Sequence, residues 1–164
     1  MRLNDRLKRY LDQEQGAYEI IPHREVFSSR EVAAESHVTD RQLAKVLAVR
    51  EEDDGHLMVV LPAACRLDLN ALRHATGRHR LSFVSEDDMG RLFPDCEIGA
   101  MPPFGQLYEM PVYLDACFSR AQTIVFRAGN HHEVVRMPYV EYERLVKPVV
   151  GEFCTHVREK DLTA

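Results

Sequence analysis

Two apolar runs separated by a charged turn constrain the fold of this chain more than any other feature. Residues 43–49 (LAKVLAV) are apolar around a single lysine, a length and pattern typical of a buried strand. Residues 57–61 form a second run, which Pro62 ends, and the intervening segment 51–55 (EEDDG) is typical of a turn. We therefore expect two buried strands joined as an antiparallel hairpin.

The remaining chain alternates irregularly between helix and strand patterns. Leucines at 3, 7 and 11 have the spacing of an amphipathic helix, and further helices are expected after Ser28, Asp68, Ser85 and Pro138. Strands are expected at residues 18–21, 80–84, 112–114, 123–126 and 133–136. These patterns predict a single α/β (α+β) domain over residues 1–154, with a mixed, largely antiparallel sheet flanked by helices. Residues 155–164 are polar and are expected to form a flexible C-terminal tail.

Composition narrows the classes of function. The formal net charge is −5, which argues against a protein that binds DNA or RNA through broad phosphate neutralisation. A pocket that holds only the end of a nucleic acid is still compatible with this charge. No apolar run approaches the ~20 residues that cross a bilayer, and the N-terminus is charged where a signal peptide would be apolar. We therefore expect a cytoplasmic protein with no membrane partner.

The four cysteines, Cys65, Cys96, Cys117 and Cys154, are scattered and include no CxxC pair. The spacing suggests neither a zinc ribbon nor a redox dithiol, and we expect small apolar side chains with reduced thiols. Cys154 and His156 are close enough in sequence for a nucleophile and base, but the spacing alone gives this pair little support.

Lys45 is the strongest single candidate for chemistry. A lysine in an apolar strand is costly unless its ammonium reaches water or a partner. It either extends to the rim of the fold without further role, or it projects into a cleft where it suits an anionic ligand or a developing oxyanion.

Residues 99–105 (GAMPPFG) and the pair His131-His132 are the other candidates. Two glycines and two adjacent prolines make a stiff loop that either turns the chain or directs backbone groups into a pocket. Adjacent histidines point in different directions and seldom bind one metal ion, so they are either exposed turn residues or donors to a substrate. The nucleophile elbow, the P-loop and the dinucleotide fingerprint are all missing from the sequence.

The chain resembles the YbaK / prolyl-tRNA-synthetase editing-domain family over residues 28–146. No single motif is specific, but the ordered set is. Lys45 matches the family's strand lysine, and Gly99 and Pro103 match the ends of its GxxxP loop. The segments that carry the resemblance are 28–34 (SSREVAA), 43–47 (LAKVL), 57–63 (LMVVLPA), 67–72 (LDLNAL), 99–105 (GAMPPFG), 112–115 (VYLD) and 128–134 (AGNHHEV).

This resemblance implies a barrel-like sheet and a trans-acting aminoacyl-tRNA deacylase, a hydrolase that removes a wrong amino acid from tRNA. It implies catalytic roles for Lys45 and Gly99, with Lys45 contacting the 3′ CCA end or the ester. It implies a substrate pocket that includes Ala100, Met101, Pro102, Pro103, His131 and His132. It implies no cofactor and no metal, and an aminoacyl-tRNA synthetase is a further expected partner.

Three alternatives stay open at this stage. The chain could be a non-catalytic module of the same fold that binds tRNA ends or a synthetase, or a hydrolase of another small acyl ester. A metal-dependent enzyme using His131, His132 or His156 is the third. The sequence does not identify the amino acid that is removed, because pocket residues set that choice.

Overall fold

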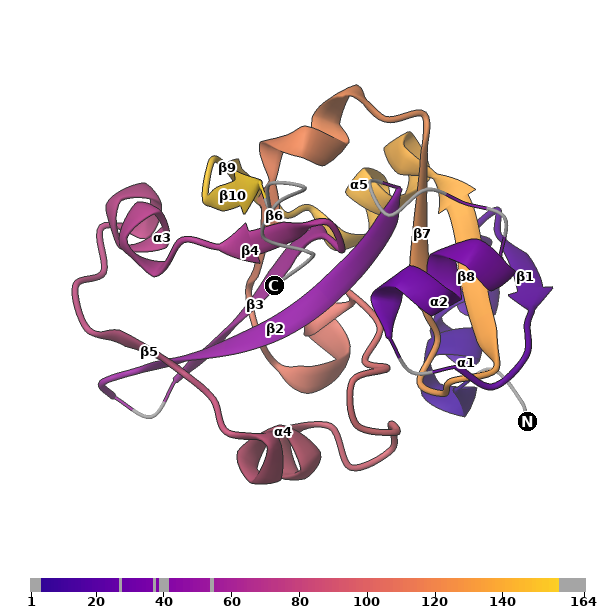
Figure 1. Ribbon diagram of the computed structural model, residues 1–164, viewed down its shortest axis with the longest axis horizontal. Helices are drawn as coiled ribbons and strands as arrows, with labels where there is room; N and C mark the ends of the chain where they lie inside the picture. Colours follow the sequence, from indigo (N-terminus) through magenta and orange to yellow (C-terminus); the bar gives the residue numbers. More distant parts are fainter. Residues whose placement is uncertain (1–3, 27, 37, 39–41, 54, 157–164) are drawn as a thin grey trace.

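A computed structural model describes residues 4–26, 28–36, 38, 42–53 and 55–156, which form a mixed sheet flanked by helices (Figure 1). The strands are β1 (Glu19–Pro22), β2 (Leu43–Glu51), β3 (His56–Pro62), β4 (Cys65–Leu67), β5 (Leu81–Phe83), β6 (Val112–Asp115), β7 (Thr123–Arg127), β8 (Glu133–Pro138), β9 (Val149–Gly151) and β10 (Cys154–His156). The helices are α1 (Asp5–Gln13), α2 (Ser29–Glu35), α3 (Leu69–Thr76), α4 (Glu86–Leu92) and α5 (Tyr139–Val146), with 3-10 turns η1 (Gly105–Tyr108) and η2 (Ala116–Arg120).

The main sheet has the strand order β1-β8-β7-β2-β3-β6-β9, with β5 also paired to β2. The expected hairpin is confirmed: β2 and β3 are antiparallel from the pair Ala44–Pro62 to the pair Arg50–His56. Pairings β2–β7, β3–β6 and β6–β9 are parallel, and each parallel pair is separated by a long stretch of chain, as a crossover requires. The mixed, largely antiparallel sheet expected from the sequence is therefore present.

Side-chain caps explain where the helices begin. Asn4, Ser28, Asp68 and Ser85 each accept a hydrogen bond from the backbone N–H three residues later, at the start of α1, α2, α3 and α4. The Ser28 hydroxyl also donates to the Glu31 carboxylate, so the two residues of the expected capping-box pattern contact each other through their side chains. Helix α5 begins directly after Pro138. None of the described helices is long and apolar enough to cross a membrane.

Strand β2 separates the apolar interior into regions on its two faces. Ala44, Val46 and Ala48 belong to the largest cluster, which also contains the aromatic residues of α5 and of the 99–105 loop. On the opposite face, Leu43 belongs to a cluster with β7 and β8, and Val49 belongs to another cluster with β3 and β4. Because side chains alternate along a strand, Lys45 faces the second side, between these two smaller clusters.

The small sheet β4–β10 differs from the sequence prediction. Thr155 pairs with Arg66, and the backbone of His156 pairs with Cys65, although both residues were expected in the tail. The strands were missed because each has only three residues, too few for an alternating pattern. Residues 157–164 of the expected tail lie outside the described residues.

Candidate functional site

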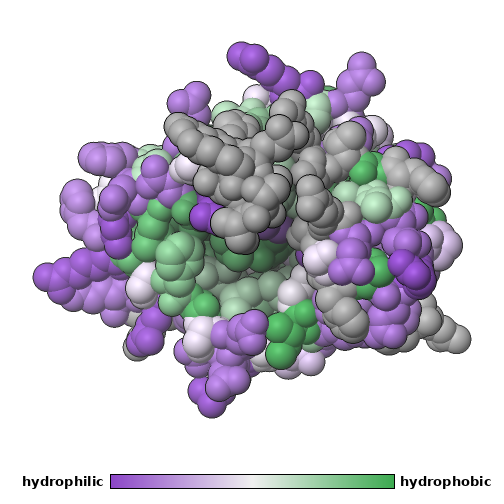
Figure 2. Space-filling view, in the orientation of Figure 1, coloured by the Kyte–Doolittle hydropathy of each residue, from purple (hydrophilic) through white to green (hydrophobic). Residues whose placement is uncertain are grey.

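Lys45 is the third residue of β2, and its side chain is half-buried. Burial lowers the pKa of its ammonium, and the positive charge of Arg66 lowers it further. Figure 2 shows a hollow with an apolar floor on the face in view, over the middle of β2. A half-buried cation between apolar clusters interacts strongly with an anionic group that approaches it, because little water screens the charge.

Arg127 is a second buried cation, at the end of β7. The parallel register of β2 and β7 pairs Leu43 with Val125 and Ala44 with Phe126, and Lys45 and Arg127 are the next residues along their strands. Arg127 is only 6% exposed, and burial lowers its pKa, although a guanidinium stays charged at neutral pH. Sequence reasoning missed this residue. The available signal was a charged residue at the end of an apolar strand, the same signal that singled out Lys45.

Arg127 contacts the Gly99 loop directly. Its Nη1 donates a hydrogen bond to the Gly99 carbonyl at 3.2 Å. Gly99 is the third residue of a turn that the Ala100 N–H closes onto the Glu97 carbonyl at 3.0 Å, and its φ of +84° is that of a type II turn. Glycine is the residue that adopts this conformation without strain, so the position has a local structural reason to be glycine.

The loop is also fixed to the β7–β8 turn and to α5. Glu97 donates its N–H to the Gly129 carbonyl at 2.9 Å, and Gly129 donates to the Ala100 carbonyl at 2.8 Å. The buried hydroxyl of Tyr142 donates to the Pro103 carbonyl at 2.8 Å. A proline-rich segment without regular pairing is thereby held in one conformation, which is the property that a preorganised site requires.

Asn4, the N-cap residue of α1, hydrogen-bonds the β7–β8 turn and the segment that precedes the Gly99 loop. The Asn4 N–H donates to the Ala128 carbonyl at 3.0 Å, and its side-chain amide donates to the Asp95 carbonyl at 2.8 Å. Gly129 has a φ of +95°, and an added Cβ there would lie 2.8 Å from the Asn4 Cβ. This close approach requires glycine at position 129.

The two histidines diverge, as adjacent residues in a turn are expected to do. His131 is 5% exposed, and its Nε2 lies 2.8 Å from the Ile98 carbonyl; since a carbonyl only accepts, Nε2 carries the proton. His132 is more exposed and its Nε2 lies 3.8 Å from the Glu25 carboxylate. Of the two expected turn residues, His131 is therefore buried and contacts the residue directly before the Gly99 loop, and His132 is the more exposed one.

Four residues expected to line the pocket, Ala100, Met101, Pro102 and Pro103, are all buried. Met101 belongs to the largest apolar cluster, which covers the face of β2 opposite Lys45. This packing favours a core role for Met101 over contact with a substrate.

The cysteines differ from the sequence expectation of reduced thiols. Cys65 and Cys154 form a disulfide, and because the Cys154 sulfur is used there, Cys154 and His156 are not a nucleophile–base pair. Burial raises the pKa of the Cys96 thiol to about 12, and burial followed by the Asp115 carboxylate raises that of Cys117 to about 11. Neither thiol is therefore an activated nucleophile. Among the described residues, Cys65, Cys117 and Cys154 form the one group with the arrangement to hold a metal ion.

Comparison with known proteins relates this geometry to a family. Residues 23–145 match the family model described as the aminoacyl-tRNA editing domain. A curated relative, prolyl-tRNA editing protein ProX of Acetoanaerobium sticklandii, is 25% identical over 142 residues, which cover 84% of this chain and 86% of the relative.

Solved structures share the fold. One, described as a candidate trans-editing enzyme for prolyl-tRNA synthetase, has a TM-score of 0.80 at 20% identity and covers 92% of this chain and 95% of its own. The hypothetical protein APE2540 has a TM-score of 0.83 at 16% identity and covers 92% of this chain and 100% of its own. The family match includes Lys45, Arg127, the Gly99 loop and both histidines, and with most of the chain inside it, this protein belongs to the aminoacyl-tRNA editing domain family.

Proposed function

We propose that this protein is a trans-acting deacylase that hydrolyses the ester between a wrong amino acid and the 3′-terminal adenosine of tRNA. Membership of the editing-domain family supports this proposal, as does the similarity to a prolyl-tRNA editing protein over most of both chains. Such an activity is useful because the synthetic site of a synthetase favours the correct amino acid over one that differs by a methylene by only ~1–3 kcal/mol.

The observation that carries the proposal is a half-buried lysine on β2 together with a buried arginine that holds the Gly99 loop. Lys45 lies between two apolar clusters on one face of β2, and the Arg127 guanidinium at the end of β7 binds the Gly99 carbonyl. An aminoacylated CCA end brings a phosphate, an ester carbonyl and an apolar or small side chain together. The cations suit the phosphate, the fixed backbone groups suit the ester carbonyl, and the apolar surroundings suit the side chain.

In the proposed reaction a water oxygen attacks the ester carbonyl carbon and forms a tetrahedral oxyanion. The Lys45 ammonium either stabilises that oxyanion or holds the terminal phosphate so that the ester reaches the loop. The bond to the ribose oxygen then breaks, and that oxygen takes up the proton that the attacking water gives up, which releases the amino acid and a tRNA with its terminal hydroxyl restored. Arg127 acts through Gly99 and is a positioning residue. Because an aminoacyl ester is already activated, placing water and stabilising charge are sufficient chemistry, with no metal in the reaction.

The test is deacylation of a panel of tRNAs charged with Cys, Ala, Ser, Thr or Pro, by the wild-type chain, Lys45→Ala and Lys8→Ala. Lys8 is the matched control because it is an exposed lysine on α1 that pairs with Asp12. We expect one mischarged ester to be lost rapidly, a decrease of ~10²–10³-fold in Lys45→Ala, and no change in Lys8→Ala.

Binding of charged tRNA is measured in parallel. Tight binding without hydrolysis of any ester above the blank would overturn the proposal in favour of a non-catalytic module. Faster hydrolysis of small acyl esters than of any charged tRNA would overturn it in favour of a different hydrolase.

A further inference from the structure

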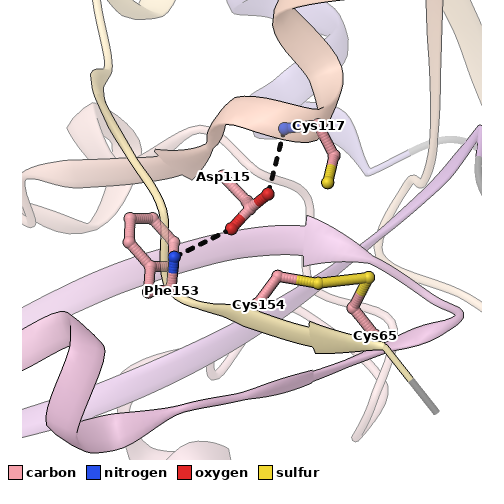
Figure 3. The surroundings of a disulfide bond; sticks show 5 residues. All are labelled: Cys65, Asp115, Cys117, Phe153 and Cys154. Carbon is pink, nitrogen blue, oxygen red and sulfur yellow. Dashed lines mark hydrogen bonds between the residues drawn. A yellow bond between two sulfur atoms is a disulfide. The ribbon is translucent and has the colours of Figure 1, made fainter.

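Three cysteine sulfurs gather at one point although the residues are far apart in sequence. Cys65 lies on β4, Cys117 on η2 and Cys154 on β10, and all three Sγ atoms lie within 4.8 Å of one another. Two of them, Cys65 and Cys154, form a disulfide, and Figure 3 shows the Cys117 side chain directed toward it. The three residues extend from the buried Cys65 to the exposed Cys117, so an ion from solvent has access to one side of the group.

Asp115 holds two of the three cysteine-bearing segments in place. The Cys117 N–H donates to its Oδ1 at 3.0 Å, and the Phe153 N–H, one residue before Cys154, donates to its Oδ2 at 3.0 Å (Figure 3). Asp115 is 2% exposed, so this carboxylate is an internal brace and not a surface group. Asp115 therefore fixes the backbone of two cysteine-bearing segments and so limits where their sulfurs can lie, as the outer partners of metal ligands do.

The spacing of the sulfurs fits a tetrahedral thiolate site after small side-chain movements. Sulfur ligands lie about 2.3 Å from Zn²⁺, which separates two tetrahedral sulfurs by about 3.8 Å. The three sulfurs already lie within 4.8 Å of one another, so opening the disulfide and rotating the side chains covers the difference. Three protein ligands leave the fourth position to water.

We propose that Cys65, Cys117 and Cys154 form a redox-gated binding site for a thiophilic metal ion such as Zn²⁺. While the disulfide is present, two of the three sulfurs are bonded to each other and the site is closed. A dithiol reductant supplies two electrons and two protons, which break the bond and leave Cys65 and Cys154 as thiols. The ion then binds as the three thiols release their protons to solvent, so that three thiolates coordinate one cation.

The bound ion would replace the disulfide as the link between β4 and β10 and would add η2 to the same link. Arg66 lies between Cys65 and Leu67 on β4, and its charge acts on Lys45. Binding of an ion or opening of the disulfide would therefore act on Lys45 through Arg66. The metal-binding inference itself does not depend on the deacylase activity.

The first test uses the full chain reduced by a phosphine and freed of oxygen and reductant. We expect it to bind one Co²⁺ with sulfur-to-metal charge-transfer absorption, and Zn²⁺ to displace the Co²⁺. Cys65→Ser, Cys117→Ser and Cys154→Ser should each lower the Zn²⁺ affinity by more than ~100-fold, because loss of a supporting group alone costs ~10–100-fold. Asp115→Asn is expected in that smaller range. Cys96→Ser, which replaces a thiol placed beside Tyr108, is the matched control and should bind as the wild type does.

The second test needs no variant, so it does not depend on whether the serine proteins fold. The reduced wild-type chain is alkylated with and without Zn²⁺, and each cysteine is read by peptide mass spectrometry. Zn²⁺ should protect Cys65, Cys117 and Cys154 together and leave the modification of Cys96 unchanged, while the oxidised chain should bind at least ~100-fold more weakly. Uniform modification with and without Zn²⁺, or wild-type affinity in Cys117→Ser, would show that the three sulfurs are not one metal site.

Discussion

The two faces of β2 differ in how completely apolar side chains cover them. On one face Ala44, Val46 and Ala48 lie in a continuous cluster with residues from most other elements of the fold. On the other face two smaller clusters lie on either side of Lys45, and the charge of Arg66 acts on its ammonium. Strand β2 therefore contributes Ala44, Val46 and Ala48 to the largest apolar cluster and Lys45 to the candidate site.

Because of this difference, we expect neighbouring residues of the fold to affect different properties, either stability or activity. Large apolar side chains on the covered face are expected to decide stability, because each removes much surface from water. The charged residues on the interrupted face are expected to decide activity and to contribute little to stability, since burial of a charge is unfavourable. Substitutions matched across the two faces test this separation.

Phe104→Ala is expected to have the largest effect, on stability. Phe104 is fully buried and its ring contacts Tyr10, Phe126 and Tyr142 edge to face. Removal of the ring should lower the free energy of unfolding by ~3–5 kcal/mol, measured by urea denaturation. Phe83→Ala is the control, because Phe83 is 59% exposed and should change stability by less than ~0.5 kcal/mol. Similar losses in both variants would contradict the assignment of Phe104 to the core.

Lys45→Met should have the opposite profile. We expect deacylation to fall by ~10²–10³-fold, because the ammonium is lost from the site. Burial lowers the Lys45 pKa, so the charged form is unfavourable in the folded state, and an apolar side chain of similar length should leave stability unchanged or raise it by up to ~1 kcal/mol. Paired urea denaturation and deacylation assays check both parts. A loss of stability comparable with that of Phe104→Ala would make Lys45 a structural residue.

Tyr142→Phe tests the connection between the core and the Gly99 loop. The change removes the hydrogen bond to the Pro103 carbonyl and leaves that carbonyl buried without this donor, at an expected cost of ~1–3 kcal/mol in unfolding free energy. The loop should also lose order, which hydrogen exchange at the Ala100 and Phe104 amides would detect. Tyr113→Phe is a suitable comparison, and equal exchange in the two variants would argue against a role of Tyr142 in holding the loop.

Arg66→Gln should have the smallest effect, a shift in the pH dependence of deacylation. The ammonium of Lys45 is the active form in the proposal, so catalysis above the blank should fall as pH rises through the lowered Lys45 pKa. Removing the positive charge of Arg66 favours the ammonium, raises that pKa and moves the fall to higher pH, by less than about one unit. Arg120→Gln, another exposed arginine, should leave the profile in place. A shift to lower pH in Arg66→Gln would contradict the electrostatic argument.

Much of the fold could be predicted because local rules decide it. The β2–β3 hairpin follows from two apolar runs around a charged turn, and the caps at Ser28, Asp68 and Ser85 follow from side chains that bond nearby amides. Lys45 was visible because a charge interrupted an apolar run.

What the sequence did not reveal depends on contacts between distant residues. The β2–β7 pairs Leu43–Val125 and Ala44–Phe126 join residues 82 positions apart, and Arg127 holds Gly99 across 28 positions, so no local pattern contains either contact. The disulfide joins cysteines 89 positions apart, and β4 and β10 are too short to show a periodicity. Burial of His131 likewise depends on the Ile98 carbonyl, which only the folded chain brings near.

The long-range hydrogen bonds of Asn4 constrain the order in which the chain can fold during translation. Asn4 bonds the backbone of Asp95 and Ala128, and Tyr10 donates to the Leu145 carbonyl 135 positions later. Residues up to Leu145 must therefore leave the ribosome before helix α1 finds these partners and the two loops take their places. Such long-range contacts slow folding and leave α1 with an exposed apolar side in the interval. Helix α1 is thus exposed to aggregation and proteolysis until helix α5 has been synthesised.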